Sequence, residues 1–214
     1  KIMELNAILE STSTCRYYNE DDIDDDTLKN VLAAARWGPS GGNRQPVSLI
    51  VIRDKEKKIA LQDLYLPLWE PYVRGIKKGE IKISARNSKM LKAADHFARN
   101  ISEIPVLIQV CARLEDVHPT DVNLDRLSIV GGASVYPAVQ NILLMARSHG
   151  LGSALTTLLC TVEPDVKKIL KIPQEVSTAA LLTLGYPKNP FPAKLNRKPI
   201  EEMCWAETFG NNYF

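Results

Sequence analysis

The chain has 214 residues, of which 45% are hydrophobic and 24% are charged, and its formal net charge is +2. This composition is typical of a single folded domain with a sizeable core, and it argues against a disordered chain. The basic residues form no stripe with interleaved aromatics, and no apolar run approaches ~18–20 residues. We therefore expect neither nucleic acid nor a membrane as a partner.

Hydrophobic periodicity and turn residues predict the elements of the first half in chain order. Residues 65–87 lack a clean period, and we interpret them as an irregular or helical insertion near a site. The acidic run 19–26 lacks the glycine and glutamate of a calcium loop, so its carboxylates are expected to cap the helix that follows. The predicted helices are 3–10, 26–37, 55–64 and 88–100, and the predicted strands are 47–53 and 106–111.

The second half is predicted to contain a helix over 129–149 that is apolar nearly all round. Such a helix is either central in the fold or packed on a partner subunit. Gly150-Leu151-Gly152 follows a helix rather than a strand, so it is no dinucleotide fingerprint, and Gly150 is expected to end the helix in a left-handed conformation. Strands at 153–159 and 177–184, a helix at 163–170 and an extended arm at 188–214 complete the prediction.

The spacing of cysteines and histidines gives no sign of a metal site or of a disulfide framework. Four cysteines lie far apart without a Cys-x-x-Cys pair, and the three histidines are isolated in the sequence. The first residues show no signal-peptide pattern. These features predict a cytoplasmic protein that binds no metal.

The connection from the helix at 26–37 to the strand at 47–53 carries the main functional signal. Small residues at 38–42 are followed by two carboxamides, Asn43 and Gln45. Glycine lets the backbone approach a flat ligand closely, and uncharged amides can donate and accept hydrogen bonds. This chemistry suits a heterocycle or a polyol better than a phosphate. The alternative is an ordinary helix-to-strand turn.

The pattern Pro39-Ser40-x-x-Asn43-x-Gln45-Pro46 before an apolar strand resembles the flavin-binding segment of the nitroreductase family. Three further segments agree in the family's order, so that the resemblance covers essentially the whole chain: Thr12–Tyr18, Ala133–Gly152 and Leu184–Glu202.

The resemblance implies one domain over 1–214 with an α+β nitroreductase-like fold, a central and mostly antiparallel sheet wrapped by helices. It also implies an intertwined homodimer with FMN at the subunit interface. NAD(P)H is then the expected electron donor. The acceptor is expected to be a small electron-poor molecule such as a nitroaromatic, a quinone or an activated alkene. The cofactor carries the difficult chemical step, so no catalytic side chain is assigned.

The cofactor phosphate requires cations, and Arg16 and Arg197 are the candidates, with Lys198 beside the second. Thr12 and Ser13 stand where the family has two basic residues, so the electrostatic attraction of the phosphate is expected to depend more on Arg16 and Arg197. In the family, the segment equivalent to 154–158 passes the flavin edge. The residues expected to bind the cofactor are Thr12, Ser13, Thr14, Arg16, Pro39, Ser40, Asn43, Gln45, Leu155, Thr156, Thr157, Arg197 and Lys198.

Three alternatives stay open at this point. The same fold and flavin could serve another reaction, namely a dehydrogenase, a dehalogenase or a flavin-cleaving enzyme. The protein could bind flavin without catalysis, for storage or sensing. It could also be a scaffold that has lost the cofactor. Reduction of bound flavin by NAD(P)H separates an enzyme from a storage protein.

Overall fold

A computed structural model describes residues 3–82 and 85–214, and its centre is a four-stranded sheet. The strands are β1 (Val47–Ile52), β2 (Val106–Arg113), β3 (Gly152–Thr156) and β4 (Val176–Gly185), in the spatial order β1-β2-β4-β3. All three neighbouring pairs are antiparallel, so the predicted sheet type is confirmed.

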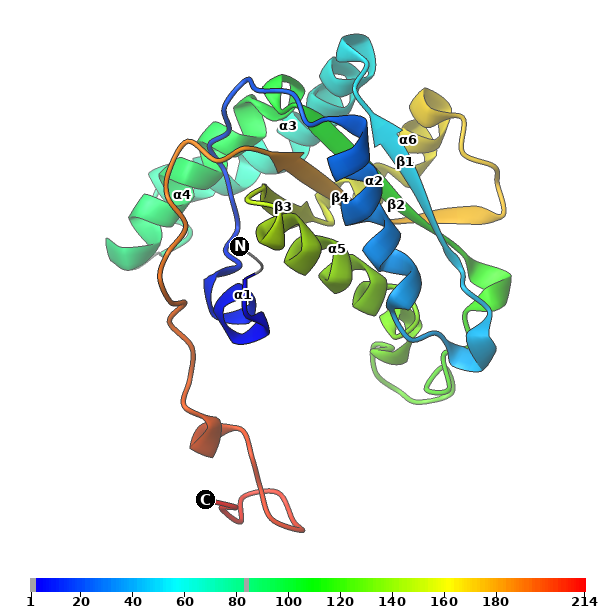
Figure 1. Ribbon diagram of the computed structural model, residues 1–214, viewed down its shortest axis with the longest axis vertical. Coiled ribbons are helices and arrows are strands. Elements are labelled where there is room, and N and C mark those ends of the chain that lie inside the picture. The colour runs from blue at the N-terminus through cyan, green and yellow to red at the C-terminus, as the bar shows by residue number, and fades with distance from the viewer. Residues whose placement is uncertain (1–2, 83–84) are drawn as a thin grey trace.

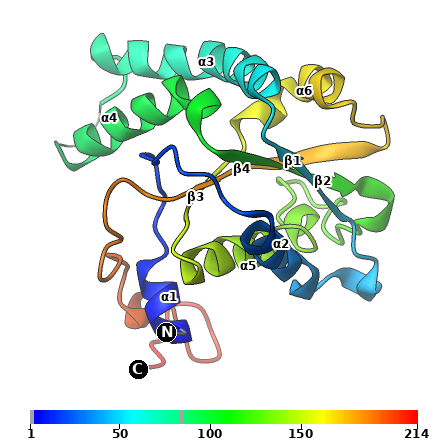
Figure 2. The same cartoon turned by 45° about the horizontal axis from the view of Figure 1, so that its top comes forward.

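Helices cover both faces of this sheet (Figures 1 and 2). One face carries α1 (Leu5–Ser11), α2 (Asp25–Ala33) and α5 (Tyr136–Ser148), and the other carries α3 (Lys55–Lys77), α4 (Ala85–Arg99) and α6 (Glu163–Leu170). Because successive side chains of a strand point to opposite faces of the sheet, β2 contributes side chains to the hydrophobic core on each face. Ile108 and Val110 pack with the helices α2 and α5, whereas Leu107 and Cys111 pack with α3 and α6.

Two local predictions are confirmed at the ends of helices. The Asp24 carboxylate accepts a hydrogen bond from the Thr27 backbone N–H at 2.8 Å, and this bond lowers the pKa of Asp24. Gly150 has a φ of +75°, the left-handed conformation expected where α5 ends.

Two helix boundaries differ from the prediction. The helix predicted over 55–64 continues as α3 to Lys77, so the helical alternative for 65–77 is the one found, while residues 83–84 lie outside the described part. Burial of Tyr65 and Val73 outweighs the backbone hydrogen bonds that Pro67 and Pro71 remove. Conversely, the helix predicted from residue 129 begins only at Tyr136, after a short 3₁₀ turn over Val130–Gly132.

The other differences from the prediction concern the end of β3, at the edge of the sheet, and the arm. The strand predicted to 159 ends at Thr156, where a 3₁₀ turn over Leu158–Val162 follows. Residues 188–195 are hydrogen-bonded to Tyr17 and Glu10, and the arm then extends away from the sheet to the C-terminus, with a short 3₁₀ turn at Ile200–Glu202 (Figure 1).

A loop over residues 117–132 is organised by one carboxylate. Asp121 is only 5% exposed and accepts hydrogen bonds from the Ser128 hydroxyl at 2.6 Å, the Arg126 guanidinium at 2.8 Å and the Ile129 N–H at 2.9 Å. These donors, the Ser128 hydroxyl foremost, lower the pKa of Asp121 to about 2. The charged carboxylate therefore stabilises the folded loop.

We expect the Asp121 carboxylate to contribute a stability that is lost in acid. Its pKa in the folded protein lies below the unfolded value of about 3.9, so the contribution is complete above pH 4 and disappears between about pH 4 and pH 2. The substitution Asp121→Asn should lower the free energy of unfolding in urea at pH 7, and the deficit should shrink below pH 4. Asp63→Asn, on exposed α3, is the control. A deficit that does not vary with pH would contradict this account.

Candidate cofactor site

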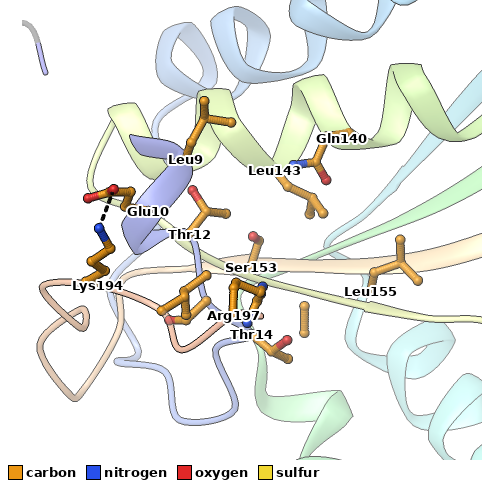
Figure 3. Close-up of a pocket in the computed structure, with 13 residues that line it drawn as sticks. Leu9, Glu10, Thr12, Thr14, Gln140, Leu143, Ser153, Leu155, Lys194 and Arg197 are labelled. Atoms are coloured by element: carbon orange, nitrogen blue, oxygen red, sulfur yellow. Dashed lines mark ion pairs between the residues drawn. The ribbon is translucent and has the colours of Figure 1, made fainter. Parts of the chain in front are cut away.

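A hollow of about 530 Å³ lies between α1, α5, β3 and the arm (Figure 3). This volume falls in the range of small-molecule and cofactor sites. The residues that line it are Leu9, Glu10, Thr12, Ser13, Thr14, Gln140, Leu143, Ser153, Ala154, Leu155, Lys194, Leu195 and Arg197.

The hydroxyl-bearing wall of this cavity is held against the edge strand. The Cys15 N–H donates to the Ser153 carbonyl at 2.8 Å, and a Cβ at Gly152 would lie 2.6 Å from the Cys15 sulfur. Only glycine therefore lets residues 12–16 lie this close to β3. This contact places Ser13 and Thr14 on the cavity, next to the start of the strand.

The three hydroxyls of this wall are not equivalent. The Thr12 hydroxyl donates to the Ile8 carbonyl at 2.6 Å and so offers only its oxygen to a ligand. In the described part of the chain, the hydroxyls of Ser13 and Thr14 donate to no other protein group. They are therefore the two donors that the wall can give to an anion.

Arg197 brings the positive charge to this cavity. Its guanidinium is exposed, lies beside Thr14 in Figure 3, and donates to the Asn196 carbonyl at 3.0 Å. Within residues 3–82 and 85–214, no carboxylate lies within salt-bridge distance of it. Lys198, by contrast, does not line the cavity, and its Nζ lies 3.9 Å from Glu202.

Arg16, the other arginine expected at the phosphate, does not line this cavity. It lines two smaller hollows of about 180 and 160 Å³, the first together with His96 and Lys188 and the second with Ser13, Thr14 and Phe191. The structure therefore brings Thr12, Ser13, Thr14, Leu155 and Arg197 together on the large cavity, whereas Arg16 shares only the smallest of these hollows with Ser13 and Thr14.

The carboxamide loop is a second, separate group. Ser40 and Gln45 line a hollow of about 280 Å³ between η1 (Ala34–Trp37), β1 and α5, and Pro39 and Asn43 line neither this hollow nor the large cavity. The Ser40 hydroxyl accepts from the Gln45 N–H at 2.9 Å. Asn43 and Gln45 both have positive φ, +53° and +54°, an uncommon conformation for residues with a Cβ. Such strain is typical of functional loops.

The two groups lie at opposite ends of α5. Just before its first turn, the Gly41 N–H donates to the Ser134 hydroxyl at 3.0 Å, whereas in its last turn Arg147 donates to the Ser11 hydroxyl at 3.0 Å. Since α5 has 13 residues, its ends are about 20 Å apart. Figures 1 and 2 show α1 and the loop after α2 on opposite sides of this helix.

Residues 155–157, which the family resemblance places at the flavin edge, have three different surroundings in the structure. Leu155 lines the large cavity and is 39% exposed. Thr156 points to the opposite side, where its hydroxyl lies 3.3 Å from the Tyr65 hydroxyl. Thr157 lines a further hollow of about 390 Å³ that also contains Tyr136 and Cys160.

Several cavity residues were not expected from the sequence. Gln140 and Leu143 on α5 are three residues apart, so helical periodicity could have placed them on one face. Ser153 lies directly before the segment considered. Glu10, Lys194 and Leu195 give no sequence signal, because a contact between α1 and the arm joins positions about 185 residues apart in the chain.

Comparison with known proteins matches residues 9–186 to the Nitroreductase family. The chain belongs to this family. It is 29% identical to an iodotyrosine dehalogenase 1 homolog of Caenorhabditis elegans over 89% of the chain, which spans only 57% of that relative. It is 23% identical to an FMN reductase [NAD(P)H] of Bacillus subtilis, over 97% of the chain and 76% of the relative.

Solved structures agree on the fold. A BluB-like flavoprotein from Clostridium difficile superposes with a TM-score of 0.71 at 21% identity, covering 96% of this chain and all 100% of that chain. The nitroreductase-like α+β fold is thereby confirmed. Among the described residues, no helix is long and apolar enough to cross a bilayer, and no three metal-binding side chains gather in one place.

We expect the strain at Gln45 to be functional rather than stabilising. Gln45→Gly should leave the free energy of unfolding unchanged or raise it by up to about 1 kcal/mol, because glycine adopts positive φ without strain. Binding of added FMN should nevertheless weaken, because the side-chain amide is gone. Lys171→Gly is the control, since Lys171 also has a φ of +54° but ends α6 away from both groups. Chemical unfolding and flavin titration measure both effects; a Gln45→Gly variant with wild-type flavin affinity would contradict the assignment.

Proposed function

We propose that this chain is an FMN-dependent oxidoreductase that passes hydride from NAD(P)H through the flavin to a small electron-poor acceptor. Nitroaromatics, quinones and activated alkenes are the acceptor classes. The observation that carries the proposal is the cavity at the end of α5, where Arg197 faces two donor hydroxyls without a carboxylate partner in the described residues. The four unpaired cysteines fit a reducing compartment such as the cytoplasm.

The donor set of this cavity fits the phosphate end of FMN. A phosphate monoester carries nearly two negative charges at neutral pH, and a guanidinium can bind it through two parallel hydrogen bonds. Ser13 and Thr14 can donate to the remaining oxygens. Leu155 and Leu143 add apolar surface on the far side of the cavity, where a ring would extend.

The carboxamide loop is supplied, in this proposal, by a second copy of the chain. One chain places its own loop about 20 Å from its own cavity, at the other end of α5. In a homodimer, the loop with Asn43 and Gln45 from one copy would contact the flavin held by Arg197 of the other. Each dimer would then contain two composite sites.

The surface of the chain supports a dimer. Its accessible area is 13,381 Å², whereas a compact monomer of this mass exposes about 9,900 Å². Large apolar side chains contribute to the difference on the loop 117–132 and on the arm, including Leu127 and Phe209, each 92% exposed. Obligate dimer interfaces bury roughly 2,000–5,000 Å² in total, or about 1,000–2,500 Å² per partner, so burial in a dimer would account for part of this excess per chain.

The protein's part in the reaction is binding and orientation. When bound, FMN supplies a ring that takes a hydride from NAD(P)H and delivers it to the acceptor. Arg197, Ser13 and Thr14 hold the phosphate, and the backbone at 155–157 borders the ring. The carboxamides of the partner's loop hydrogen-bond the polar edge of the ring without adding charge.

A second candidate reaction is reductive dehalogenation, which the 29% identity to an iodotyrosine dehalogenase homolog favours. The two candidates are separated by their acceptors. FMN-loaded protein reduced by NAD(P)H without oxygen should be reoxidised by a nitroaromatic or a quinone in the first case. In the second case a halogenated phenol should reoxidise it with release of halide.

We expect the purified protein to be yellow and to contain one non-covalent FMN per chain, because each copy has one phosphate cavity. The absorbance spectrum and the flavin released on denaturation measure this content. NAD(P)H added without oxygen should bleach the bound flavin. Colourless protein that also fails to take up added FMN would contradict the proposal.

We expect Arg197→Ala to weaken FMN much more than riboflavin, because riboflavin has no phosphate. A charge-assisted hydrogen bond contributes ~1.5–3 kcal/mol, so the FMN Kd should rise by roughly 10- to 150-fold. Arg74→Ala, an exposed arginine on α3 across the sheet, is the control. Equal losses for FMN and riboflavin, measured by fluorescence titration, would show that Arg197 holds the arm in place instead.

A further inference from the structure

Residues 188–195 of the arm lead to the cavity and contact the rest of the domain at three points. The Lys188 N–H donates to the Tyr17 carbonyl at 3.0 Å, and the Leu195 N–H donates to the Glu10 carbonyl at 2.7 Å. Between them, the Phe191 ring lies 3.9 Å from the guanidinium carbon of Arg147. Arg197 follows two residues after the last fastening.

Arg147 connects this stretch to the helices on which the cavity is built. Its Nε donates to the Ser11 hydroxyl of α1 at 3.0 Å, while its guanidinium carbon lies over the Phe191 ring. Ser11 is 3% exposed, so this end of the contact is buried. A cation over an aromatic ring within about 6 Å is attracted by the ring's electron density. The contact therefore ties the arm to α1 and α5 together.

The same stretch of the arm neutralises the negative charge of Glu10 in the cavity. Glu10 lines the cavity, and an unpaired carboxylate there would repel a phosphate. The Lys194 ammonium lies 2.8 Å from the Glu10 carboxylate, the ion pair drawn in Figure 3. The two side chains are 71% and 48% exposed, so the pair adds little to stability, but it does cancel the negative charge at this position.

We propose that residues 188–197 form a strap that makes the cavity selective for a phosphorylated flavin. Phe191 and Lys194 are positioning residues in the strap: Phe191, held by Arg147, places Arg197 at the phosphate end, and Lys194 neutralises Glu10. The proposal rests on the proposed function, and it names the groups that decide between FMN and unphosphorylated riboflavin.

The first test compares Phe191→Leu with Phe209→Leu, a matched change at an arm residue that is 92% exposed. Leucine keeps apolar volume and removes the aromatic face. The ratio of riboflavin Kd to FMN Kd should fall by about 2- to 5-fold in Phe191→Leu and stay at the wild-type value in Phe209→Leu. A general loss of structure would weaken both flavins and leave the ratio unchanged, which would overturn the role of Phe191.

The second test removes the positive charge of Lys194 or the negative charge of Glu10, and the two changes have different expected effects on FMN affinity. Lys194→Met exposes the Glu10 carboxylate and should weaken FMN about 1.5- to 5-fold without affecting riboflavin. Glu10→Gln should leave FMN affinity equal or higher, and the double variant should return to near the wild-type affinity. Lys29→Met, an exposed lysine of α2, controls for the change in net charge. A double variant as weak as Lys194→Met would overturn the neutralisation of Glu10.

Failure of the strap can be told from failure of the flavin assignment. If Arg197→Ala lowers the ratio of riboflavin Kd to FMN Kd but Phe191→Leu and Lys194→Met do not, the phosphate cavity stands and the strap proposal is wrong. If none of the three variants changes the ratio, the cavity does not bind the phosphate, and both proposals are wrong.

Discussion

The groups suited to bind a flavin are held at the two ends of one helix, and a single chain cannot bring them together. Ser134, two residues before α5, fixes the carboxamide loop, and the last turn of α5 fixes α1 and the arm through Arg147. Both attachments are side-chain hydrogen bonds to a rigid element, so the separation of about 20 Å is a property of the fold. The proposed homodimer follows from this constraint, because a second copy can place its loop where the first cannot.

In the proposed site, the phosphate would be bound by few charged groups. One guanidinium, two hydroxyl donors and a neutralised carboxylate take the place of the pair of basic residues that the family has where this chain has Thr12 and Ser13. Close approach of the hydroxyl segment to β3 depends on Gly152, which has no Cβ to meet Cys15. An exposed arginine costs less to desolvate than a buried one, but it needs a support that fixes its position. The arm, tied to α1 and α5, is that support.

The sequence predicts the sheet, four of the six helices within a few residues and the capping by Asp24, because these depend on local periodicity and local hydrogen bonds. It is less accurate where tertiary packing decides. Burial of Tyr65 and Val73 stabilises α3 despite the two prolines inside it. The turn at Gly131 and Gly132 delays the start of α5. The site was predicted by motif, so its residue types are present, but motifs cannot tell which of them share one cavity. Arg16 and Arg197 are equivalent by charge, and only the path of the arm places Arg197 on the large cavity, which Arg16 does not line.

The central claim, a flavin site shared between two copies, is tested most directly by complementation. Protomers carrying Arg197→Ala are combined with protomers carrying Gln45→Gly, and the mixed dimer is isolated through two different affinity tags. One of its two sites then unites an intact cavity with an intact loop, and the other contains both defects. The account predicts that each altered homodimer binds FMN weakly, whereas the mixed dimer binds one FMN with wild-type affinity. A mixed dimer that binds FMN as weakly at both sites as the altered homodimers do would contradict it.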